Sequence, residues 1–357
     1  MKRVRVGLLG CSGVVGQNYL VRLQHHPWFE VTFLAGGDGS RQRLFGEVVR
    51  ERGAFGEFSP AIANLPLFGV DDTKEVEERC DLLISCIGER AIAAKWEAFY
   101  ASKGLIVISN TSAHREVSDV PVIIPEINPD HLGALHLQRE RFGTDRGGIV
   151  TKPNCTVQSY LTPLFALHTR FRLKRIIVTT LQAVSGAGYP GVSSLDMIDN
   201  VIPYIEGEEE KSEREPLKIL GSLTQTGIAP LEGVKIAAHC NRVPVLHGHT
   251  ACVSVEFDTP PDLDEVKEVW RSFRGLPQEL NLPSAPHHPI CVRDEVNRPQ
   301  PRLDRETEGG MSVVVGRLRP CPVLDIRFVA LTHNVIRGAA GGGILNAELI
   351  VKSEFWA

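Results

Sequence analysis

Cys155 is the residue whose setting most suggests chemistry. It stands in the segment Lys152-Pro153-Asn154-Cys155-Thr156, where we expect a short strand to end at Pro153 and a helix to begin at Asn154 or Cys155. A thiol at a helix N-terminus has its thiolate stabilised by the helix dipole and by unpaired N–H groups. The same N–H groups can hold the oxyanion formed when sulfur attacks a carbonyl carbon. The pattern therefore indicates a nucleophilic cysteine, with a small buried apolar side chain as the alternative interpretation.

A nucleophilic cysteine needs a group that accepts and donates protons, and the chain contains 12 histidines. His249 stands out because it follows a glycine in the segment NRVPVLHGHT (241–250), with Arg242 seven residues upstream. The guanidinium fork of an arginine is a natural clamp for a substrate carboxylate. Taken alone, His249 is equally compatible with a structural histidine.

Histidines and cysteines also gather in this region, which raises the possibility of a zinc site. The residue types are those of zinc ligands, but their spacings match no finger or hydrolase pattern, and alternate residues of a strand point to opposite faces. We therefore expect no metal centre among His239, Cys240, His247, His249 and Cys252.

A glycine-rich turn lies near the N-terminus, in Gly10-Cys-Ser-Gly-Val-Val-Gly16, between an expected strand over 4–9 and an expected helix over 14–25. Such glycines let the backbone approach a pyrophosphate, and the helix N-terminus supplies free N–H groups. The spacing departs from G-x-G-x-x-G, so a turn without a ligand is the alternative. The candidate cofactor-binding residues here are Gly10, Ser12, Gly13, Val14, Val15 and Gly16.

The residues after the second strand bear on the choice of dinucleotide. Asp38 lies 22 positions after Gly16, near the place of the acidic residue that binds the ribose 2′-hydroxyl of NAD. Ser40, Arg41 and Arg43 follow, and they could instead hold a 2′-phosphate. These residues leave NAD and NADP both open.

The elements that position these groups follow two patterns. In the first part, nearly all-apolar strands alternate with helices, which is typical of buried parallel strands in βαβ units; the strands are expected at 4–9, 31–35, 82–87 and 105–109, with a further helix at 90–101. After Lys152, β-rich runs predict a larger mixed or antiparallel sheet, at 175–184, 234–238, 249–257, 311–318 and 324–332. Pro163 predicts a kink or break in the helix after Cys155.

The fold class is therefore α/β: a Rossmann-type parallel sheet domain and an α+β catalytic and dimerisation domain with a large mixed sheet. We expect the dinucleotide-binding domain at 1–152, completed by a C-terminal helix at 338–357, and the catalytic domain at 153–337. Loops surround one helix (263–274) within 258–310, and the densest charge cluster is the acidic run 206–215.

Composition narrows the class of protein. A chain of 357 residues suggests about two domains. A net charge of −4 argues against nucleic-acid or membrane-surface partners, which usually meet a basic face. No apolar run approaches the length of a membrane span, and the N-terminus does not resemble a signal peptide. Eight cysteines without a C-x-x-C pair indicate reduced thiols and a cytoplasmic protein.

Taken together, the motifs resemble the aspartate-β-semialdehyde dehydrogenase family, specifically its archaeal and fungal type. The resemblance runs nearly end to end and is carried by GCSGVVG (10–16), SNTSAHR (109–115), PNCT (153–156), LQAVSGAGYPGV (181–192), NVIPYIEGEEEK (200–211), CNRVPVLHGHT (240–250), ELNLPSAP (279–286), RPQPRLDR (298–305) and HNVIRGAAGG (333–342). It implies NADP-dependent, reversible reductive dephosphorylation of L-aspartyl-4-phosphate to L-aspartate-4-semialdehyde through a cysteine thioester, in lysine, threonine and methionine biosynthesis.

The resemblance also implies residue roles. Cys155 is the nucleophile and His249 the acid/base, while Asn154 and Gln182 position the substrate. Arg242 holds the substrate carboxylate, Glu208 its amino group, and Lys211 and Arg115 the phosphate. On the cofactor side, the glycine turn cradles the dinucleotide, Ser40 and Arg41 lie near the 2′-phosphate, Gly186 lies near the nicotinamide, and Asn334 closes the site. A homodimer or homotetramer is expected.

Three departures from the family pattern touch the cofactor side and leave NAD as an alternative to NADP. Lys152 stands where the family usually has asparagine, 85–89 reads Ser-Cys-Ile-Gly-Glu, and the loop 36–40 lacks an earlier serine. Malonyl-CoA reductases, which resemble this family closely and could share the Asn-Cys and His placement, are the nearest rival; they would not need a clamp for a substrate amino group, so Glu208 and Arg242 favour the semialdehyde. N-acetyl-glutamyl-phosphate reductases and glyceraldehyde-3-phosphate dehydrogenases share fewer motifs. Two rival classes lie outside enzymes: a nucleotide-binding paralogue that has lost catalysis, and a zinc-binding structural protein.

Overall fold

The computed structural model describes residues 3–356, so Met1, Lys2 and Ala357, at the ends of the predicted domains, lie outside the described residues. Its first sheet is six-stranded and parallel throughout, with the order β3-β2-β1-β4-β5-β6. The strands are β1 (Val4–Leu9), β2 (Phe29–Ala35), β3 (Leu67–Phe68), β4 (Leu82–Ser85), β5 (Ile106–Ser109) and β6 (Gly148–Thr151). The predicted Rossmann-type sheet is confirmed, and its strand order reverses between β1 and β4, where such sheets bind ligands.

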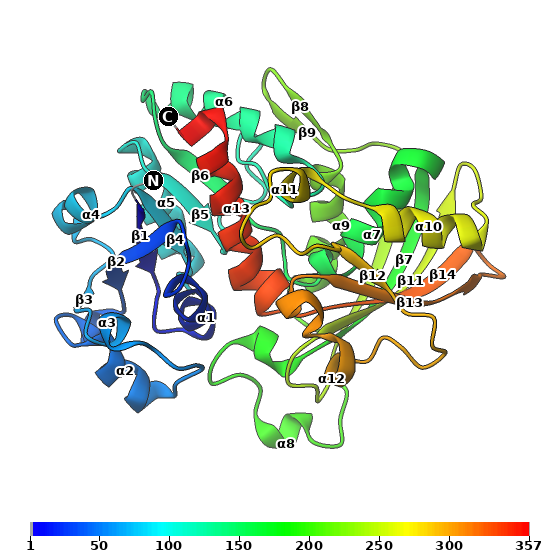
Figure 1. Ribbon diagram of the computed structural model, residues 1–357, viewed down its shortest axis with the longest axis horizontal. Coiled ribbons are helices and arrows are strands. Elements are labelled where there is room, and N and C mark those ends of the chain that lie inside the picture. Colours follow the sequence, from blue (N-terminus) through cyan, green and yellow to red (C-terminus); the bar gives the residue numbers. More distant parts are fainter. Residues whose placement is uncertain (1–2, 357) are drawn as a thin grey trace.

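Helices cover both faces of this sheet, as parallel strands require. One apolar cluster joins the sheet to α1 and α2, and a second, on the other face, joins it to α4 and α5. The helices of this half are α1 (Val14–Leu23), α2 (Phe45–Arg52), α3 (Pro60–Ala63), α4 (Thr73–Arg79), α5 (Arg90–Ser102) and α6 (Ala134–Phe142), with short 3-10 turns at Asp38–Ser40 and Pro129–Gly133 (Figure 1).

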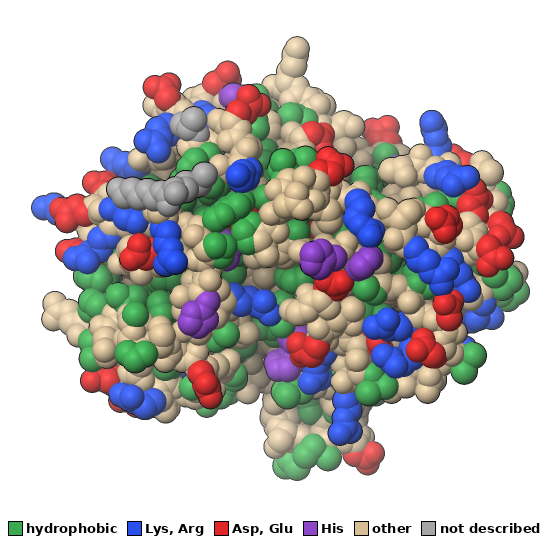
Figure 2. All heavy atoms as spheres, viewed as in Figure 1, with side chains coloured by type: hydrophobic (Ala, Val, Ile, Leu, Met, Phe, Trp, Pro, Cys, Tyr) green, Lys and Arg blue, Asp and Glu red, His purple; other side chains and the backbone are tan. Residues whose placement is uncertain are grey.

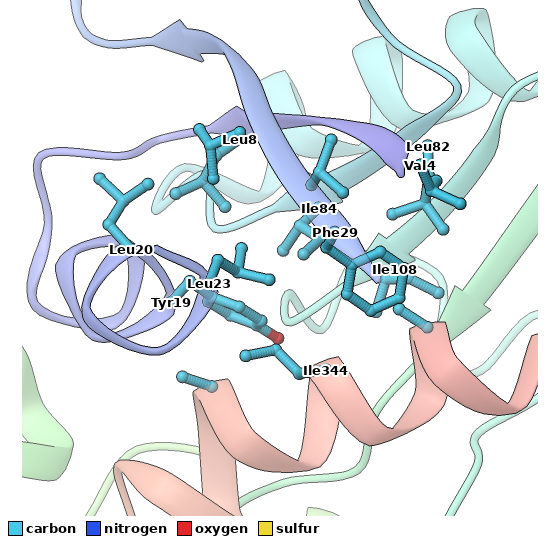
Figure 3. Packing of buried hydrophobic residues seen from close by; sticks show 14 of the residues in the cluster. Val4, Leu8, Tyr19, Leu20, Leu23, Phe29, Leu82, Ile84, Ile108 and Ile344 are labelled. Carbon is cyan, nitrogen blue, oxygen red and sulfur yellow. The ribbon is translucent and has the colours of Figure 1, made fainter. Parts of the chain in front are cut away.

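The end of the chain returns to the first sheet. Helix α13 (Gly341–Lys352) follows a π-helical turn, η5 (Ile336–Ala340), and a last 3-10 turn spans Glu354–Trp356. Figure 3 shows Ile344 of α13 facing Tyr19 and Leu23 of α1 and the sheet residue Ile108, all in one apolar cluster. The glycines at the start of α13 allow this contact, because an added methyl group at Gly343 would collide with the Tyr19 hydroxyl.

The second sheet is also six-stranded and is mixed, with the order β10-β7-β11-β14-β13-β12. Its strands are β7 (Leu173–Gln182), β10 (Lys235–Arg242), β11 (His249–Phe257), β12 (Ile290–Val292), β13 (Val313–Pro320) and β14 (Ile326–Thr332). The predicted large mixed sheet is confirmed. The register places Gln182 beside Arg242, so both side chains reach the same end of the sheet as His249.

One face of this sheet is packed and the other is open. An apolar cluster joins it to α7 (Val157–Phe171), α9 (Glu208–Ile219) and α10 (Leu263–Ser272). The opposite face leaves Ile177, Leu181 and Cys252 exposed. The remaining elements are α8 (Ser194–Met197), the hairpin β8 (Ser222–Thr224) and β9 (Gly227–Ala229), α11 (Leu276–Glu279), α12 (Pro301–Asp304), and 3-10 turns at Val184–Ala187 and Thr307–Gly310.

Two local predictions in the second half are corrected by the structure. Helix α7 is bounded at Val157, two to three residues after the predicted start, while Asn154 caps the turn before it: its side chain accepts the Thr156 N–H and its carbonyl accepts the Gln158 N–H. The helix also continues through Pro163 without a break. Tertiary contacts stabilise the helix at this point. The Pro163 carbonyl accepts a hydrogen bond from Trp270, and the packing of the buried helix outweighs the backbone hydrogen bond that proline cannot donate.

Candidate active site

A cavity of about 480 Å³ lies between the two sheets, where the carboxyl ends of β4, β5 and β6 meet β7 and β10. Both halves of the chain contribute to its wall. The predicted residues that line it are Val15, Arg115, Asn154, Cys155, Gln182, Gly186, Glu208, Lys211, Arg242 and Asn334. The structure therefore brings together side chains that lie up to 319 positions apart in the sequence (334 − 15).

Cys155 sits in the turn between β6 and α7, with Sγ 3.3 Å from Nε2 of His249. His249 is the first residue of β11 and is fully buried. The backbone N–H of Ala183 donates to its Nδ1 at 3.0 Å, which fixes the orientation of the ring. A glycine permits the close packing behind the sulfur, since a methyl group at Gly338 would lie 2.7 Å from Cβ of Cys155.

The protonation states of this pair differ from the expected thiolate. Burial, and next the negative charge of Glu208, raise the pKa of Cys155, although Lys152, Arg115 and Arg242 act in the opposite direction. Cys155 lies in the turn that Asn154 caps immediately before α7. Burial, with Arg242 and His333, lowers the pKa of His249 to about 3. The pair at rest is a thiol beside a neutral imidazole.

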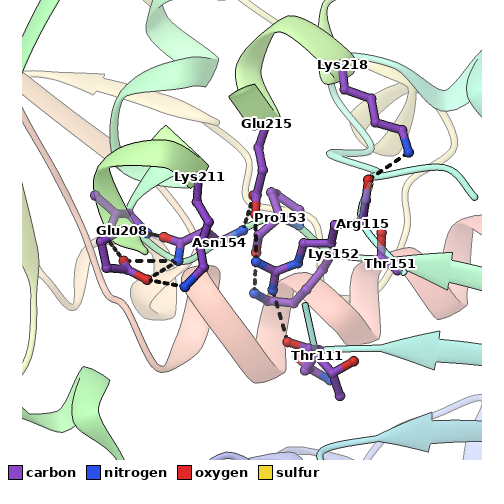
Figure 4. A network of polar contacts seen from close by, with 12 residues as sticks. Thr111, Arg115, Thr151, Lys152, Pro153, Asn154, Glu208, Lys211, Glu215 and Lys218 are labelled. Atoms are coloured by element: carbon purple, nitrogen blue, oxygen red, sulfur yellow. Dashed lines mark hydrogen bonds and ion pairs between the residues drawn. The ribbon is translucent and has the colours of Figure 1, made fainter. Parts of the chain in front are cut away.

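Glu208, at the start of α9, is the centre of a polar network. Its carboxylate accepts hydrogen bonds from Asn154, Gln182 and Lys211 at 2.9–3.1 Å (Figure 4). Burial opposes its ionisation, but Lys211 and the amide donors outweigh that effect, so the pKa of Glu208 is lowered. A buried anion is thus held on the cavity wall, where it can bind a substrate cation.

Arg242 ends β10 and directs its guanidinium into the same cavity. Nη1 donates to the Ala183 carbonyl at 2.9 Å, and the rest of the fork has no carboxylate partner among the hydrogen bonds of residues 3–356. Gly186 lies against it: a methyl group there would be 2.9 Å from Nη1. This arrangement leaves Arg242 available to a carboxylate of a bound molecule.

Arg115 is held on the opposite wall. Nη1 donates to Glu215 of α9 at 2.8 Å, and Nη2 donates to the Asn110 carbonyl at 3.0 Å. The other oxygen of Glu215 accepts the Asn154 N–H, as Figure 4 shows. Arg115 and Lys211 therefore approach the cavity from two elements, each anchored by a glutamate of α9.

Several cavity residues were not predicted as site residues. Lys152 is the most prominent: it lines the cavity, is almost fully buried, and has its pKa lowered to about 8, mainly by burial. The sequence marked it only as a departure from the family pattern. Asn110 also lines the cavity, and its side chain accepts from the Tyr19 hydroxyl. Asn334 is placed as predicted; its side chain contacts the Gly248 N–H and Ser185.

The glycine turn has the form of a dinucleotide cradle. A methyl group at Gly10 or Gly16 would lie 2.5 Å from a backbone oxygen, so both positions need glycine to close the turn. Gly13 is exposed, a methyl group there would only touch the Gly10 carbonyl oxygen at 3.8 Å, and no side chain caps α1. The uncapped N–H groups of α1 fit a pyrophosphate. Val15 links this turn to the cavity.

The residues predicted to lie near a 2′-phosphate follow β2. Ser40 is buried, and its hydroxyl donates to the Gly37 carbonyl. Arg41 is exposed and pairs with three carboxylates, Asp38, Asp71 and Asp72. Neither residue lines the cavity. In the glycine turn itself, the Ser12 hydroxyl accepts a hydrogen bond from Arg52.

Residues 3–356 were also compared with the requirements of a metal site and of a membrane-spanning helix. No group of three or more His, Cys, Asp and Glu side chains within 3–356 is arranged to hold a metal ion. None of the helices in that range has the length and apolarity needed to span a membrane. On the face in Figure 2, acidic and basic side chains are interspersed instead of forming one basic patch.

Two family models match the chain. The semialdehyde dehydrogenase NAD binding domain matches residues 5–135, and the semialdehyde dehydrogenase dimerisation domain matches residues 162–337. An aspartate-semialdehyde dehydrogenase of Methanothermobacter thermautotrophicus is 44% identical over 349 residues, which covers 97% of this chain and 99% of the relative. A malonyl CoA reductase (NADP) of Metallosphaera sedula is 38% identical and covers 99% of this chain and 98% of the relative.

The fold agrees with these matches. The crystal structure of the aspartate semialdehyde dehydrogenase with NADP from Candida albicans superposes with a TM-score of 0.89 at 34% identity, covering 98% of both chains.

Proposed function

Because the chain belongs to the aspartate-semialdehyde dehydrogenase family, we propose that it catalyses the NADP-dependent, reversible conversion of L-aspartyl-4-phosphate to L-aspartate-4-semialdehyde and phosphate. The observation that carries the proposal is Cys155 Sγ 3.3 Å from His249, in a cavity that also presents a buried carboxylate and an available guanidinium. The biosynthesis of lysine, threonine and methionine is the proposed setting, and the cytoplasm the proposed location.

The substrate is bound through its two charged ends. Arg242 takes the α-carboxylate as a fork, and Glu208 takes the ammonium group. Asn154 and Gln182, which donate hydrogen bonds to Glu208, position the substrate beside it. The aldehyde carbon then lies near the sulfur of Cys155. A malonyl thioester carries no amino group, so Glu208 favours the semialdehyde over a malonyl-CoA reductase.

The chemistry passes through the sulfur. In the oxidative direction Cys155 adds to the aldehyde carbon and forms a thiohemiacetal, and loss of hydride leaves a thioester. The nicotinamide supplies the hydride acceptor when the dinucleotide is bound. His249 is the proposed acid/base: it takes the thiol proton and passes it to the carbonyl oxygen as the thiohemiacetal forms, and it takes that proton back as the hydride leaves. Phosphate held by Arg115 and Lys211 attacks the thioester and releases the sulfur. Biosynthesis runs these steps in reverse.

The cofactor residues are proposed from the shape of the turn. Backbone groups of Gly10, Ser12, Gly13, Val14, Val15 and Gly16 would hold the pyrophosphate at the N-terminus of α1. Gly186 and Asn334 would flank the nicotinamide, because both line the cavity. Ser40 and Arg41 remain the candidates for the 2′-phosphate region. NADP is the proposed cofactor, since the superposed Candida albicans structure is described with NADP.

The open face of the second sheet is the proposed homodimer surface. It carries Ile177 and Leu181, which are 42% and 36% exposed, within the region matched by the dimerisation model. A homotetramer would require a further surface. Light scattering of the purified chain measures the assembly directly.

The function is tested by following NADPH formation from aspartate semialdehyde, with NADP or NAD and with or without phosphate. We expect NADP- and phosphate-dependent oxidation. NADPH oxidation with malonyl-CoA at a higher kcat/KM than with aspartyl phosphate would favour the acyl-CoA reductase instead. Dinucleotide binding without turnover of either substrate would favour the non-catalytic paralogue.

A further inference from the structure

Four charged residues of α9 lie on one side of the helix. Glu208, Lys211, Glu215 and Lys218 are separated by three, four and three positions, which is the spacing of one helix face. Their charges alternate in sign, and all except Lys211 are buried. Glu208 and Lys211 line the cavity, whereas Glu215 and Lys218 lie outside its lining. The proposed reaction therefore assigns a role to the first two and none to the last two.

Two further glutamates attach another side of α9 to the second sheet. The carboxylate of Glu209 accepts the backbone N–H of Cys240 at 3.0 Å. Glu213, one turn later, accepts that of Ala238 at 3.1 Å. Both N–H groups belong to β10, the outer strand of the sheet, where backbone groups need partners from outside the sheet. Helix α9 is thus fixed against the strand that ends at Arg242 in the cavity.

Glu215 joins two segments of the candidate site that lie far apart in the sequence. One carboxylate oxygen accepts a hydrogen bond from Nη1 of Arg115 at 2.8 Å, and the other accepts the backbone N–H of Asn154 at 2.6 Å. Arg115 follows β5 of the first sheet, and Asn154 caps the turn that carries Cys155. Figure 4 shows the carboxylate between the two donors. Because both oxygens are bound, Glu215 sets the separation of the guanidinium and this turn.

Lys218 fixes the backbone of the same arginine. Its Nζ donates to the carbonyl oxygen of Arg115 at 2.7 Å and to that of Val117 at 2.6 Å. Helix α9 therefore holds Arg115 at both ends, the backbone through Lys218 and the guanidinium through Glu215. Nη2 of the guanidinium donates to the Asn110 carbonyl at 3.0 Å, which restricts its rotation further. Arg115 is thus held in one orientation on the wall of the cavity.

Stability alone gives little reason for this buried ion pair. Glu215 and Arg115 are 7% and 8% exposed. Removing two charges from water costs free energy that their attraction only partly returns, so such a pair often adds little net stability. A bidentate carboxylate does provide geometry, because its two hydrogen bonds are charge-assisted and directional. Since Glu215 lies outside the cavity lining, it acts through Arg115 and Asn154 and not by touching a substrate.

We propose that Glu215 is a positioning residue that holds the Arg115 guanidinium in register with the turn of Cys155, so that phosphate bound by Arg115 faces the thioester carbon. The inference rests on the proposed function, because it concerns the phosphate step of that reaction. In this step a C–O bond to phosphate forms as the C–S bond to Cys155 breaks, and Glu215 gains or loses no proton. Its loss therefore slows the attack of phosphate without weakening phosphate binding.

The test follows the two half-reactions of the whole protein separately. NADPH formed from NADP and aspartate semialdehyde without phosphate measures thioester formation. Acid quenching and intact mass then follow the loss of the thioester after phosphate is added. In E215Q we expect the rate constant of this loss at saturating phosphate to fall about 10- to 100-fold, the effect of a misplaced reacting group. The phosphate concentration for half-maximal rate should stay the same or fall, because Arg115 keeps its charge and loses its countercharge. Thioester formation should stay within about threefold of wild type, since glutamine can still accept the Asn154 N–H.

Three further variants separate positioning from charge and from general damage. E215D keeps the charge but is one methylene too short to reach both donors, so we expect it to slow the phosphate step at least about fivefold. E213Q makes the same replacement on the same helix and keeps an acceptor for the Ala238 N–H, so it should change this step less than about twofold. In R115M/E215Q the phosphate step should be no slower than in R115M, because Glu215 acts through Arg115. Circular dichroism checks each fold, and R115K replaces R115M if that variant does not fold.

Several outcomes overturn the proposal. An equal loss in both half-reactions of E215Q would make Glu215 a structural residue only, and so would an undiminished effect of E215Q in the R115M background. An E215D variant equal to wild type would show that the charge suffices without the geometry. A phosphate step in E215Q equal to that of wild type would remove the role altogether. A failure of the proposed function is seen earlier and separately: wild type itself would form no thioester from aspartate semialdehyde, or would lose it no faster with phosphate, and the positioning role would fall with it.

Discussion

Replacement of Glu208 by glutamine tests how the cavity selects its substrate. Glutamine keeps the shape of the side chain and can still accept from Asn154 or Gln182, but it removes the negative charge. The fold should survive, because Lys211, the ion-pair partner that is left, has a side chain one-third exposed to solvent. The loss then falls on the contact with the substrate ammonium.

The size of the loss follows from the burial of Glu208. A hydrogen bond to a charged group contributes about 1.5–3 kcal/mol, and each 1.4 kcal/mol is about tenfold. We therefore expect E208Q to lower kcat/KM for aspartate semialdehyde roughly 10- to 150-fold, mainly through KM. E210Q, two residues along the same acidic run and exposed, is the control and should change kcat/KM less than about twofold.

A substrate without the amino group completes the assay. Succinate semialdehyde keeps the aldehyde and the carboxylate, so wild type and E208Q should use it with nearly equal kcat/KM. The preference for aspartate semialdehyde over succinate semialdehyde should collapse in E208Q. An equal loss on both substrates would refute the assignment, since Glu208 would then act by holding Asn154 and Gln182 and not by binding the ammonium.

Three other predictions concern the nucleophile and the buried charges. C155S should lower kcat at least about a thousandfold while NADP binding, measured by fluorescence titration, stays unchanged; a kcat within tenfold of wild type would remove Cys155 from the mechanism. Glu97 is buried behind the cavity, and burial raises its pKa from 4.5 to about 7. The folded state thus holds a proton that the unfolded chain releases, so stability falls by about 3 kcal/mol as pH rises from 4.5 through 7; urea unfolding should show this slope in wild type and lose it in E97Q. Arg337 and Glu126 form a fully buried bidentate pair, so R337M should cost about 3–5 kcal/mol of unfolding free energy. The double variant R337M/E126L should recover much of that loss, and an equal or larger loss would show that packing, not the unpaired charge, sets the cost.

The first sheet was predictable because its strands are buried on both faces. Runs such as 82–85 and 106–109 are apolar throughout apart from a closing serine, so the strands were located, although the predicted 82–87 extends two residues past the end of β4. The short strand β3 escaped prediction because two residues carry no periodicity. Helix α9 escaped because its first turn is Glu208, Glu209 and Glu210, which reads as a solvated run. That charge suits a helix N-terminus, and Glu208 lines the cavity.

The site was predictable in its residue types and not in its electrostatics. The sequence motifs identified Cys155 and His249 as candidates. The contact between them joins positions 94 apart in the sequence and depends on the whole second sheet. A pattern cannot show burial, and burial is what makes the resting pair a thiol and a neutral imidazole. Lys152 shows the same limit: its sequence neighbours place it beside Cys155, while its enclosure follows only from the assembled walls.

The residues that line the cavity carry an excess of positive charge. Five cationic side chains line it against one carboxylate, in a chain whose net charge is −4: the cations are Arg90, Arg115, Lys152, Lys211 and Arg242, and the carboxylate is Glu208. Gathering cations in one cavity costs free energy unless each is partnered. Helix α9 reduces that cost by placing Glu208 against Lys211 and Glu215 against Arg115. If Glu208 binds the substrate ammonium as proposed, the ammonium competes with Lys211 for the same oxygens, and Lys211 is then available to the proposed phosphate. The acidic run that resembled a solvated surface thus provides the carboxylate partners of two cavity cations.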